Sequence, residues 1–234
     1  MKKAYKIFKR IIDFVIALIL FIILLPIMVI VAIAIKIDSK GPIFFKQERS
    51  GKNNKVFLMY KFRSMAVSND VLNFKEADKT TKVGKFIRKT SLDEIPQLIN
   101  ILKGDMSFIG PRPWITEYSK YFTEEQMHRL DVLPGMTGLA QCEGRNGISI
   151  TEKINFDLKY VKDISLKMDL YVIYKTIYTV FSAKNAVGNK DIIKNELEDL
   201  KKQFNKKDND IQKSKKKIIN EEIEKEEIGE EVYA

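Results

Sequence analysis

The chain has 234 residues, a formal net charge of +10, one histidine (His128) and one cysteine (Cys142). A single cysteine excludes an intrachain disulfide, and with only one histidine beside it a zinc site and a Cys–His nucleophile pair are both disfavoured. The charge is uneven, because residues 189–234 hold 11 Lys and 13 Asp or Glu, a net −2 that leaves +12 for the rest. A body this basic favours a polyanionic partner, such as nucleic acid, anionic lipid or nucleotide phosphates.

The first predicted element is a membrane-embedded helix within residues 1–38. The stretch Phe14–Ile35 contains no charged residue. At ~1.5 Å per residue it would reach about 33 Å as a straight helix, enough to cross the hydrocarbon core of a bilayer. It is too long for the core of a typical signal peptide, and no small-residue cleavage site follows it. A buried helix of a soluble protein is the alternative.

Two features of this segment favour a re-entrant helix, which enters and leaves the bilayer through one leaflet. Pro26 lies near the middle and removes a backbone hydrogen bond, so we expect the helix to be broken or kinked there. Both flanks are basic, which under the positive-inside rule places both ends in the cytoplasm. The basic residues are Lys2, Lys3, Lys6, Lys9 and Arg10 before the run and Lys36, Lys40, Lys46 and Arg49 after it. A kinked helix that spans the membrane once is the alternative.

A small β-hairpin is predicted next. The apolar stretches Ile43–Glu48 and Val56–Met65 flank a polar turn at residues 50–54. On the second strand Lys61 points to the same side as Phe57, because side chains alternate along a strand. That side is either a solvated face or a basic surface beside a functional site.

The segment Thr90–Trp114 reads TSLDEIPQLINILKGDMSFIGPRPW and contains the strongest candidate site. Asp93 and Glu94 open an apolar run that ends at Gly104. A rigid Gly-Pro-Arg-Pro segment then carries Arg112. Adjacent carboxylates followed by an arginine held between two prolines form a set suited to phosphate chemistry. Arg88, five residues before Asp93, adds a basic group.

Local helix capping offers a purely structural interpretation of the same residues. Ser91 could cap a helix, with Glu94 completing a capping box. Alternatively Asp93 is the cap, which places Pro96 in the first turn, where proline is tolerated. In both frames the two carboxylates lie at a helix N-terminus, which also binds phosphate well.

Further helices are predicted at Ile115–Leu130, Ile154–Tyr160 and Leu166–Phe181. His128 lies in a charged helical stretch and is expected at the surface. In the last helix an apolar stripe recurs at helical spacing, formed by Leu166, Leu170, Ile173, Ile177 and Phe181. Core packing is the first interpretation of this stripe, and a helix lying at the lipid headgroups is the second.

The segment Leu133–Ser149 is rich in glycine and is expected to form an irregular loop, with Arg145 as a candidate contact for phosphate or base. It lacks the GxGxxG and P-loop lysine patterns, which argues against a standard dinucleotide or ATP site. Residues 184–234 are predicted to form a charged tail, a marginal coiled coil or solvated helix that is partly disordered. Its apolar residues recur every seven positions, at Leu197, Phe204, Ile211 and Ile218.

Taken together, the motifs resemble the small monotopic phosphoglycosyl transferases of the bacterial sugar-transferase family, from about Lys6 to about Ser182. The resemblance rests on the basic, proline-containing N-terminal segment and three motifs: MYKFRSM at 59–65, SLDEIPQLINILKGDMSFIGPRP at 91–113 and PGMTGLAQCEGRN at 134–146. Motifs of this length in this order are very specific. Many members carry Ser-Pro at the helix break, where this chain has Leu25-Pro26.

Members of that family transfer a sugar-1-phosphate from a UDP-sugar to polyprenol (undecaprenyl) phosphate and release UMP, as the initiating step of surface glycoconjugate assembly. The resemblance implies a covalent aspartyl-phosphosugar intermediate at Asp93 and a Mg²⁺ ion, for which Asp93 and Glu94 are the candidate ligands. Glu94 is the candidate general base that deprotonates polyprenol phosphate, or else a metal ligand. The candidate substrate-binding residues, proposed from their charge, are Lys61, Arg88, Arg112 and Arg145. A polyprenyl-phosphate phosphatase and a non-catalytic lipid-binding module are the alternatives.

The expected fold is α+β and mainly helical, in three parts. Residues 1–38 form the re-entrant membrane helix, and residues 39–183 form the catalytic domain with a small β-hairpin and interfacial helices. Residues 184–234 form the charged tail. The resemblance implies the bacterial cytoplasmic membrane, with the catalytic domain facing the cytoplasm. The expected partners are a UDP-sugar, polyprenol phosphate and membrane lipids rather than nucleic acid, and a homodimer is compatible with the sequence.

Overall fold

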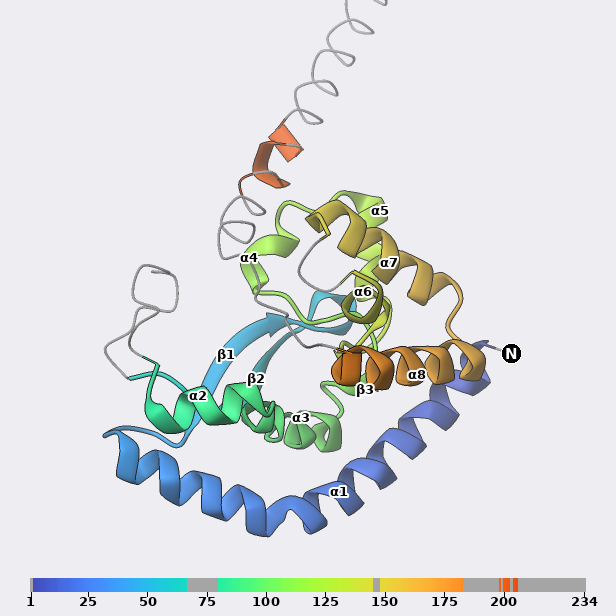
Figure 1. The fold of residues 1–234 in the computed structure, drawn as a ribbon. Coiled ribbons are helices and arrows are strands. Elements are labelled where there is room, and N and C mark those ends of the chain that lie inside the picture. Colours follow the sequence, from blue (N-terminus) through green and yellow to red (C-terminus); the bar gives the residue numbers. More distant parts are fainter. Residues whose placement is uncertain are drawn as a thin grey trace, which may run out of the picture.

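The computed structural model of the chain describes residues 2–66, 80–144 and 148–182, together with residues 198, 200–202 and 204–205 of the tail. Within them the fold is mainly helical, with a small antiparallel hairpin and a long apolar N-terminal helix, as the sequence predicts. Figure 1 shows this helix, α1, lying along one side of the molecule, with the remaining elements gathered above it.

The helix α1 (Lys2–Asp38) is continuous and contains Pro26. Figure 1 shows it as two arms that meet at an angle. Both arms pack one face against the body: Ala17 joins a buried cluster with Leu98, and Met28 joins another with Ile87. The other face is apolar and exposed, and includes Ile7, Ile11, Ile19, Ile22, Ile23, Val29, Ile30, Ile33 and Ile37. In the described part of the chain, α1 is the one helix long and apolar enough to cross a membrane.

The predicted hairpin is present. Strands β1 (Phe44–Ser50) and β2 (Val56–Phe62) pair antiparallel, with Phe44 opposite Phe62 and Ser50 opposite Val56. The turn η1 (Lys52–Asn54) places two asparagines at positive φ, a conformation that asparagine tolerates better than most residues. Phe57 and Met59 point inward into the cluster that contains Leu98. Lys61 therefore lies on the packed side of the hairpin.

A second small sheet is present that the sequence does not predict. Strand β3 (Ser107–Ile109) pairs in parallel with β4 (Gly135–Thr137). Strand β4 lies within the segment expected to be an irregular loop. Its pairing brings the chain before Arg112 beside the glycine-rich segment, and Gly135 has no room for a side chain because the Gly110 backbone lies against it.

The remaining helices surround this sheet and the hairpin in Figure 1. They are α2 (Lys82–Lys89), α3 (Gln97–Lys103), α4 (Thr116–Ser119), α5 (Glu124–Met127), α6 (Leu139–Glu143), α7 (Ile150–Lys162) and α8 (Leu166–Ser182), with the 3₁₀ turns η3 (Leu92–Glu94) and η4 (His128–Leu130). The helix predicted at Ile154–Tyr160 is confirmed as the central part of α7, and α3 ends at Gly104, in a left-handed conformation (φ 91°), as expected.

Two sequence-based predictions are wrong here. The single helix expected at Ile115–Leu130 is divided into α4, α5 and η4, because Thr123 starts a new helix through a capping box with Gln126. The apolar stripe of α8 is not core: Leu166, Leu170, Ile173 and Ile177 are 42–56% exposed, while Val172 on the opposite side is fully buried. The prediction that His128 lies at the surface is confirmed, since its side chain is 68% exposed beside Asp131.

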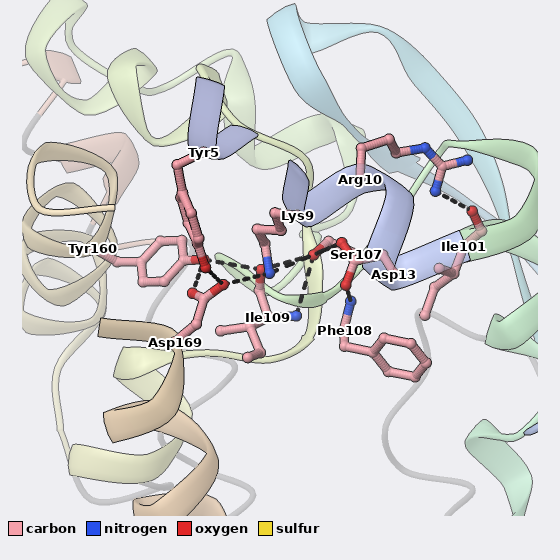
Figure 2. Close-up of polar contacts among 10 residues, drawn as sticks. All are labelled: Tyr5, Lys9, Arg10, Asp13, Ile101, Ser107, Phe108, Ile109, Tyr160 and Asp169. Atoms are coloured by element: carbon pink, nitrogen blue, oxygen red, sulfur yellow. Dashed lines mark hydrogen bonds and ion pairs between the residues drawn. The ribbon is translucent and has the colours of Figure 1, made fainter. Parts of the chain in front are cut away.

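A buried polar network fastens the first turns of α1 to the body, as Figure 2 shows. Lys9 Nζ lies 2.7 Å from Oδ2 of Asp169 on α8, and Asp169 Oδ1 accepts a hydrogen bond from the Tyr160 hydroxyl at 2.7 Å. One turn along α1, Asp13 Oδ2 accepts a hydrogen bond from the Ser107 hydroxyl of β3 at 2.7 Å. The network ties α1, α7, α8 and β3 together where the chain approaches Arg112.

The described part of the tail contacts the body. Leu200 is buried (1% exposed) in a cluster with Phe122 and Ile154. Phe204 meets the ring of Tyr121 edge-on, with the centroids 6.0 Å apart. The other residues of the predicted seven-residue repeat, Leu197, Ile211 and Ile218, lie outside the described residues.

Candidate active site

Asp93 and Glu94 lie in the 3₁₀ turn η3, between α2 and α3. Neither predicted capping frame is right. Ser91 has a left-handed conformation (φ 56°) without a side-chain cap hydrogen bond, and Pro96 occupies the N-cap position of α3. An α-helix begun at Ser91 would need the backbone N–H that proline lacks, so hydrogen bonds between residues three apart form η3 instead. The two carboxylates therefore precede α3 rather than occupy its first turn.

Glu94 brings together two cations that the sequence places 51 residues apart. Its Oε1 lies 2.5 Å from Lys61 Nζ and 3.0 Å from Arg112 Nη2. Burial alone would raise the pKa of Glu94, but the charges of Arg112 and Lys61 outweigh it and hold that pKa at about 2. Burial and the nearby Arg112 guanidinium lower the pKa of Lys61. The structure thus assembles three of the predicted site residues from β2, η3 and the segment after β3.

Asp93 is in a different environment although it is adjacent in sequence. Burial and the neighbouring Glu94 charge raise its pKa, while Lys61 and Arg88 act in the opposite direction. In the part of the chain that the structure describes, its carboxylate has no cation within ion-pair distance, in contrast with Glu94. Arg88 is near enough to act electrostatically from α2. The Asp93 oxygens are therefore available to a metal ion or to phosphorus.

Hydrogen bonds hold each backbone carbonyl group around Arg112. Four successive carbonyl oxygens, from Pro111 to Trp114, each accept a hydrogen bond. Because the flanking prolines also restrict φ, the Arg112 side chain extends from a rigid support. The donors, in the order of the carbonyls, are the Gly135 amide (3.0 Å), Arg129 Nη2 (2.9 Å), Arg49 Nη1 (3.3 Å) and the Ser50 amide (3.0 Å).

Sequence reasoning missed the contributions of Arg49 and Arg129. Arg49 counted only as a basic flank of the membrane helix, and Arg129 lay unnoticed in a charged helical stretch. Burial, followed by repulsion from Arg112, lowers the pKa of Arg49 to about 10. The side chain of Arg129 is fully buried against Asp157 of α7, 2.7 Å away. No local motif marks either residue, because both act through contacts with distant parts of the chain. Arg145, a further predicted contact, lies outside the described residues.

The acidic pair can hold a magnesium ion only with help from a ligand. Within the described ranges, no group of three or more His, Cys, Asp or Glu side chains is placed to bind a metal. Mg²⁺, however, is commonly bound through one or two carboxylates, with water and substrate phosphates supplying the remaining oxygens. Asp93, which has no ion-pair partner among the described residues, and the adjacent Glu94 fit that kind of site when a diphosphate is bound.

Comparison with known proteins identifies the family of the chain. The family model "Bacterial sugar transferase" matches residues 4–183. The chain belongs to the bacterial sugar transferase family. This confirms the resemblance inferred from the sequence motifs, and the matched range takes in α1, the acidic pair, Arg112 and α8, whereas the tail lies beyond it.

Relatives of this chain are about 40% identical to it over the aligned residues, which are about three quarters of its length. It is 40% identical over 192 residues to the UDP-glucose:undecaprenyl-phosphate glucose-1-phosphate transferase of Klebsiella pneumoniae, covering 77% of this chain and 41% of that protein. It is 38% identical over 192 residues to the UDP-N-acetylgalactosamine-undecaprenyl-phosphate N-acetylgalactosaminephosphotransferase of Aeromonas hydrophila (78% and 45%). The uncharacterized sugar transferase EpsL of Bacillus subtilis is 40% identical over 176 residues (74% and 87%). The chain thus matches less than half the length of the two relatives named by their reactions.

Proposed function

We propose that this protein transfers a sugar-1-phosphate from a UDP-sugar to polyprenol phosphate at the cytoplasmic face of the membrane and releases UMP. One observation carries the proposal: Asp93, a carboxylate without an ion-pair partner among the described residues, lies next to a carboxylate that holds Lys61 and Arg112 together. That arrangement offers a nucleophile and two cations to a diphosphate. The reactions named for the Klebsiella and Aeromonas relatives point the same way.

The proposed reaction proceeds in two displacements. The Asp93 carboxylate attacks the β-phosphorus of the donor, so that an Asp–O–P bond forms and the bond to UMP breaks with its electron pair leaving on UMP. A phosphate oxygen of polyprenol phosphate then attacks the same phosphorus and releases Asp93. Because negative charge spreads over the phosphoryl oxygens in both steps, catalysis depends mostly on positioning and charge neutralisation. Lys61, Arg88 and Arg112 would supply those charges.

We propose that Glu94 orients Lys61 and Arg112 rather than acting as a general base. A carboxylate with a pKa of about 2 is a weak base at neutral pH. The acceptor also needs no strong base, because a phosphate monoester has a second pKa of about 6 and is mostly dianionic at pH 7. The sequence-based expectation of a general base at Glu94 is therefore not retained in the proposed mechanism.

A magnesium ion would be held by Asp93 and Glu94 together with the donor diphosphate. When bound, it would neutralise part of the diphosphate charge and so reduce its repulsion of the incoming carboxylate. The protein's own part is to keep Asp93 accessible and to aim Arg112 and Lys61 at the phosphates.

We further propose that α1 is re-entrant. Its N-terminal arm is tied to α8 through Lys9 and Asp169, 2.7 Å apart. Its C-terminal end is tied to α2, where Asp38 Oδ2 accepts a hydrogen bond from the Val83 amide at 2.9 Å. A straight helix of this length would extend about 55 Å, at about 1.5 Å per residue, and would carry one end far from the body. Contacts of both ends with one body, and the two arms in Figure 1, support entry and exit through one leaflet.

The test is UMP formation by the purified protein in lipid nanodiscs with Mg²⁺, polyprenol phosphate and a panel of UDP-sugars. The panel includes UDP-glucose and UDP-N-acetylgalactosamine, the donors in the relatives' names. We expect UMP release that depends on polyprenol phosphate. Release of inorganic phosphate from polyprenol phosphate without any UDP-sugar would instead indicate a phosphatase, and neither product would indicate a binding module.

The nucleophile is tested separately with Asp93→Asn. We expect this variant to lose UMP release and the exchange of labelled UMP into the donor without acceptor. It should keep its membrane association and its melting temperature. Turnover near that of the wild type would exclude Asp93 as the nucleophile.

A further inference from the structure

A single buried arginine, Arg129, connects the support of Arg112 to the rest of the body. Its Nη2 donates to the Arg112 carbonyl oxygen at 2.9 Å, and its Nε and Nη2 donate to Asp157 Oδ2 at 3.1 and 2.7 Å. Its guanidinium carbon lies 4.2 Å from the centroid of the Trp114 ring and 5.5 Å from that of Phe122. One guanidinium thus contacts α7 and two residues, Arg112 and Trp114, of the Pro111–Trp114 segment.

These contacts extend into a continuous chain of charged groups across the candidate site. Asp157 binds Arg129, which holds the backbone of Arg112. Arg112 in turn contacts Glu94, and Glu94 contacts Lys61. Each link is a hydrogen bond or an ion pair, so the chain runs without a gap from α7 to β2. A shift of Arg129 would therefore move Arg112 before it moved anything else in the site.

Stabilisation of the fold alone does not account for the buried Arg129–Asp157 pair. Both side chains are at most 2% exposed, so the pair bears the desolvation cost of two buried charges. Its hydrogen bonding is incomplete, since Arg129 Nη1 and Asp157 Oδ1 are buried without a partner in the described structure. An apolar pair of similar volume is often equally stable in such a place. What an apolar pair could not supply is a donor for the Arg112 carbonyl oxygen.

We propose that Arg129 is a positioning residue for phosphate recognition, and that it acts by fixing the backbone of Arg112. The proposal rests on the proposed function in so far as Arg112 contacts the donor diphosphate. Arg129 itself is buried beneath the segment and does not reach the substrate. Its effect on catalysis should therefore pass entirely through Arg112.

A double-mutant cycle tests this dependence. Arg129→Lys keeps the charge but loses the planar fork that spans Asp157 and the Arg112 carbonyl oxygen. We expect it to weaken UDP affinity, measured by calorimetry in the presence of Mg²⁺, and to slow UMP release, each by about tenfold, within the coupling range seen for contacting residues. In an Arg112→Ala background the same change should have almost no further effect. Equal losses in both backgrounds would overturn the proposal.

Arg63→Lys provides a matched control. Arg63 is also buried and also holds two backbone carbonyl oxygens, those of Lys40 (2.7 Å) and Ser39 (2.8 Å), but it makes no contact with Arg112. Any effect of Arg63→Lys should be the same with and without Arg112. If its effect also vanished in the Arg112→Ala background, the coupling would be general and the special role of Arg129 would be refuted.

A spectroscopic readout avoids activity altogether. Trp114 is the only tryptophan in the chain and stacks on Arg129, so its fluorescence reports on the supporting segment. We expect Arg129→Lys to increase quenching of Trp114 by acrylamide, and Arg63→Lys to leave it unchanged. Unchanged quenching in Arg129→Lys would contradict the proposal.

The binding and activity measurements separate this proposal from the proposed function. If UDP affinity shows the coupling but no UMP is released, the role of Arg129 stands and the proposed transferase activity is refuted. A wild-type protein that binds no UDP would overturn both.

Discussion

Glu94 and Arg112 are joined by a 3.0 Å contact between Oε1 and Nη2, and the same Glu94 oxygen lies 2.5 Å from Lys61. One anionic oxygen therefore holds two cations that would otherwise repel each other. The arrangement leaves Asp93, the preceding residue, outside these ion pairs. The different environments of these adjacent carboxylates lead to two predictions about Glu94.

Glu94→Gln should reduce UMP release by about a hundredfold. Glutamine keeps the shape of the side chain but removes the negative charge, so Lys61 and Arg112 lose their common partner and separate. Losing a set of preorganised charges in an active site commonly costs 10²–10³-fold in rate, that is, roughly 3–4 kcal/mol. Steady-state UMP formation measures the effect. A general base at Glu94 would produce a loss that shrinks as pH rises, whereas the orienting role predicts the same loss from pH 6.5 to 8.5.

Protein stability should fall in acid because of Glu94. Its pKa is held at about 2, below the ordinary value of 4.5, so the ionised group stabilises the folded state above about pH 4.5. That contribution is lost as pH falls from 4.5 toward 2. Thermal unfolding of the wild type and of Glu94→Gln should therefore differ most above pH 5 and converge near pH 2. The raised pKa of Asp93 acts with the opposite sign. Because the Glu94 charge is one of its causes, its reduction in Glu94→Gln offsets part of the expected difference.

The two ends of α1 should be labelled from the same side of the membrane. Single cysteines at Lys3 and Ser39, in a Cys142→Ser background, would be treated in intact cells with an impermeant maleimide and again after permeabilisation. Both should react only after permeabilisation, because both ends of α1 are proposed to lie on the cytoplasmic side. Labelling of one end alone in intact cells would show that α1 spans the membrane.

Breaking the network at the start of α1 should destabilise the protein. Asp169→Leu leaves Lys9 without its 2.7 Å partner in a place where the Lys9 side chain is only 12% exposed. Removing one member of a buried ion pair commonly costs about 3–5 kcal/mol. Denaturant unfolding in detergent would measure the loss.

The control for this prediction is Lys175→Met. It breaks a more exposed pair on the same helix, 3.5 Å from Glu143, and should change stability by less than about 1 kcal/mol. Equal effects of Asp169→Leu and Lys175→Met would show that the network of Figure 2 does not fasten α1.

Local patterns determined much of this protein. An uncharged run, basic flanks and one proline indicated the long apolar helix, and alternation around a polar turn indicated the hairpin. The motifs indicated the family and the residues of the candidate site. Each of these signals lies within a short stretch of sequence, where periodicity, charge and backbone restriction directly determine the local structure.

The tertiary structure alone decided how those parts act on one another. Strand β2 and the Pro111–Trp114 segment meet at η3. Because of this meeting, Glu94 pairs with Lys61 and Arg112, whereas Asp93 stays outside these ion pairs. Arg129 supports Arg112 only because α7 approaches it. The apolar stripe of α8 is exposed because the opposite face of the helix packs on the body. Such contacts join residues tens of positions apart, and no local pattern specifies the partner that a buried charge will find.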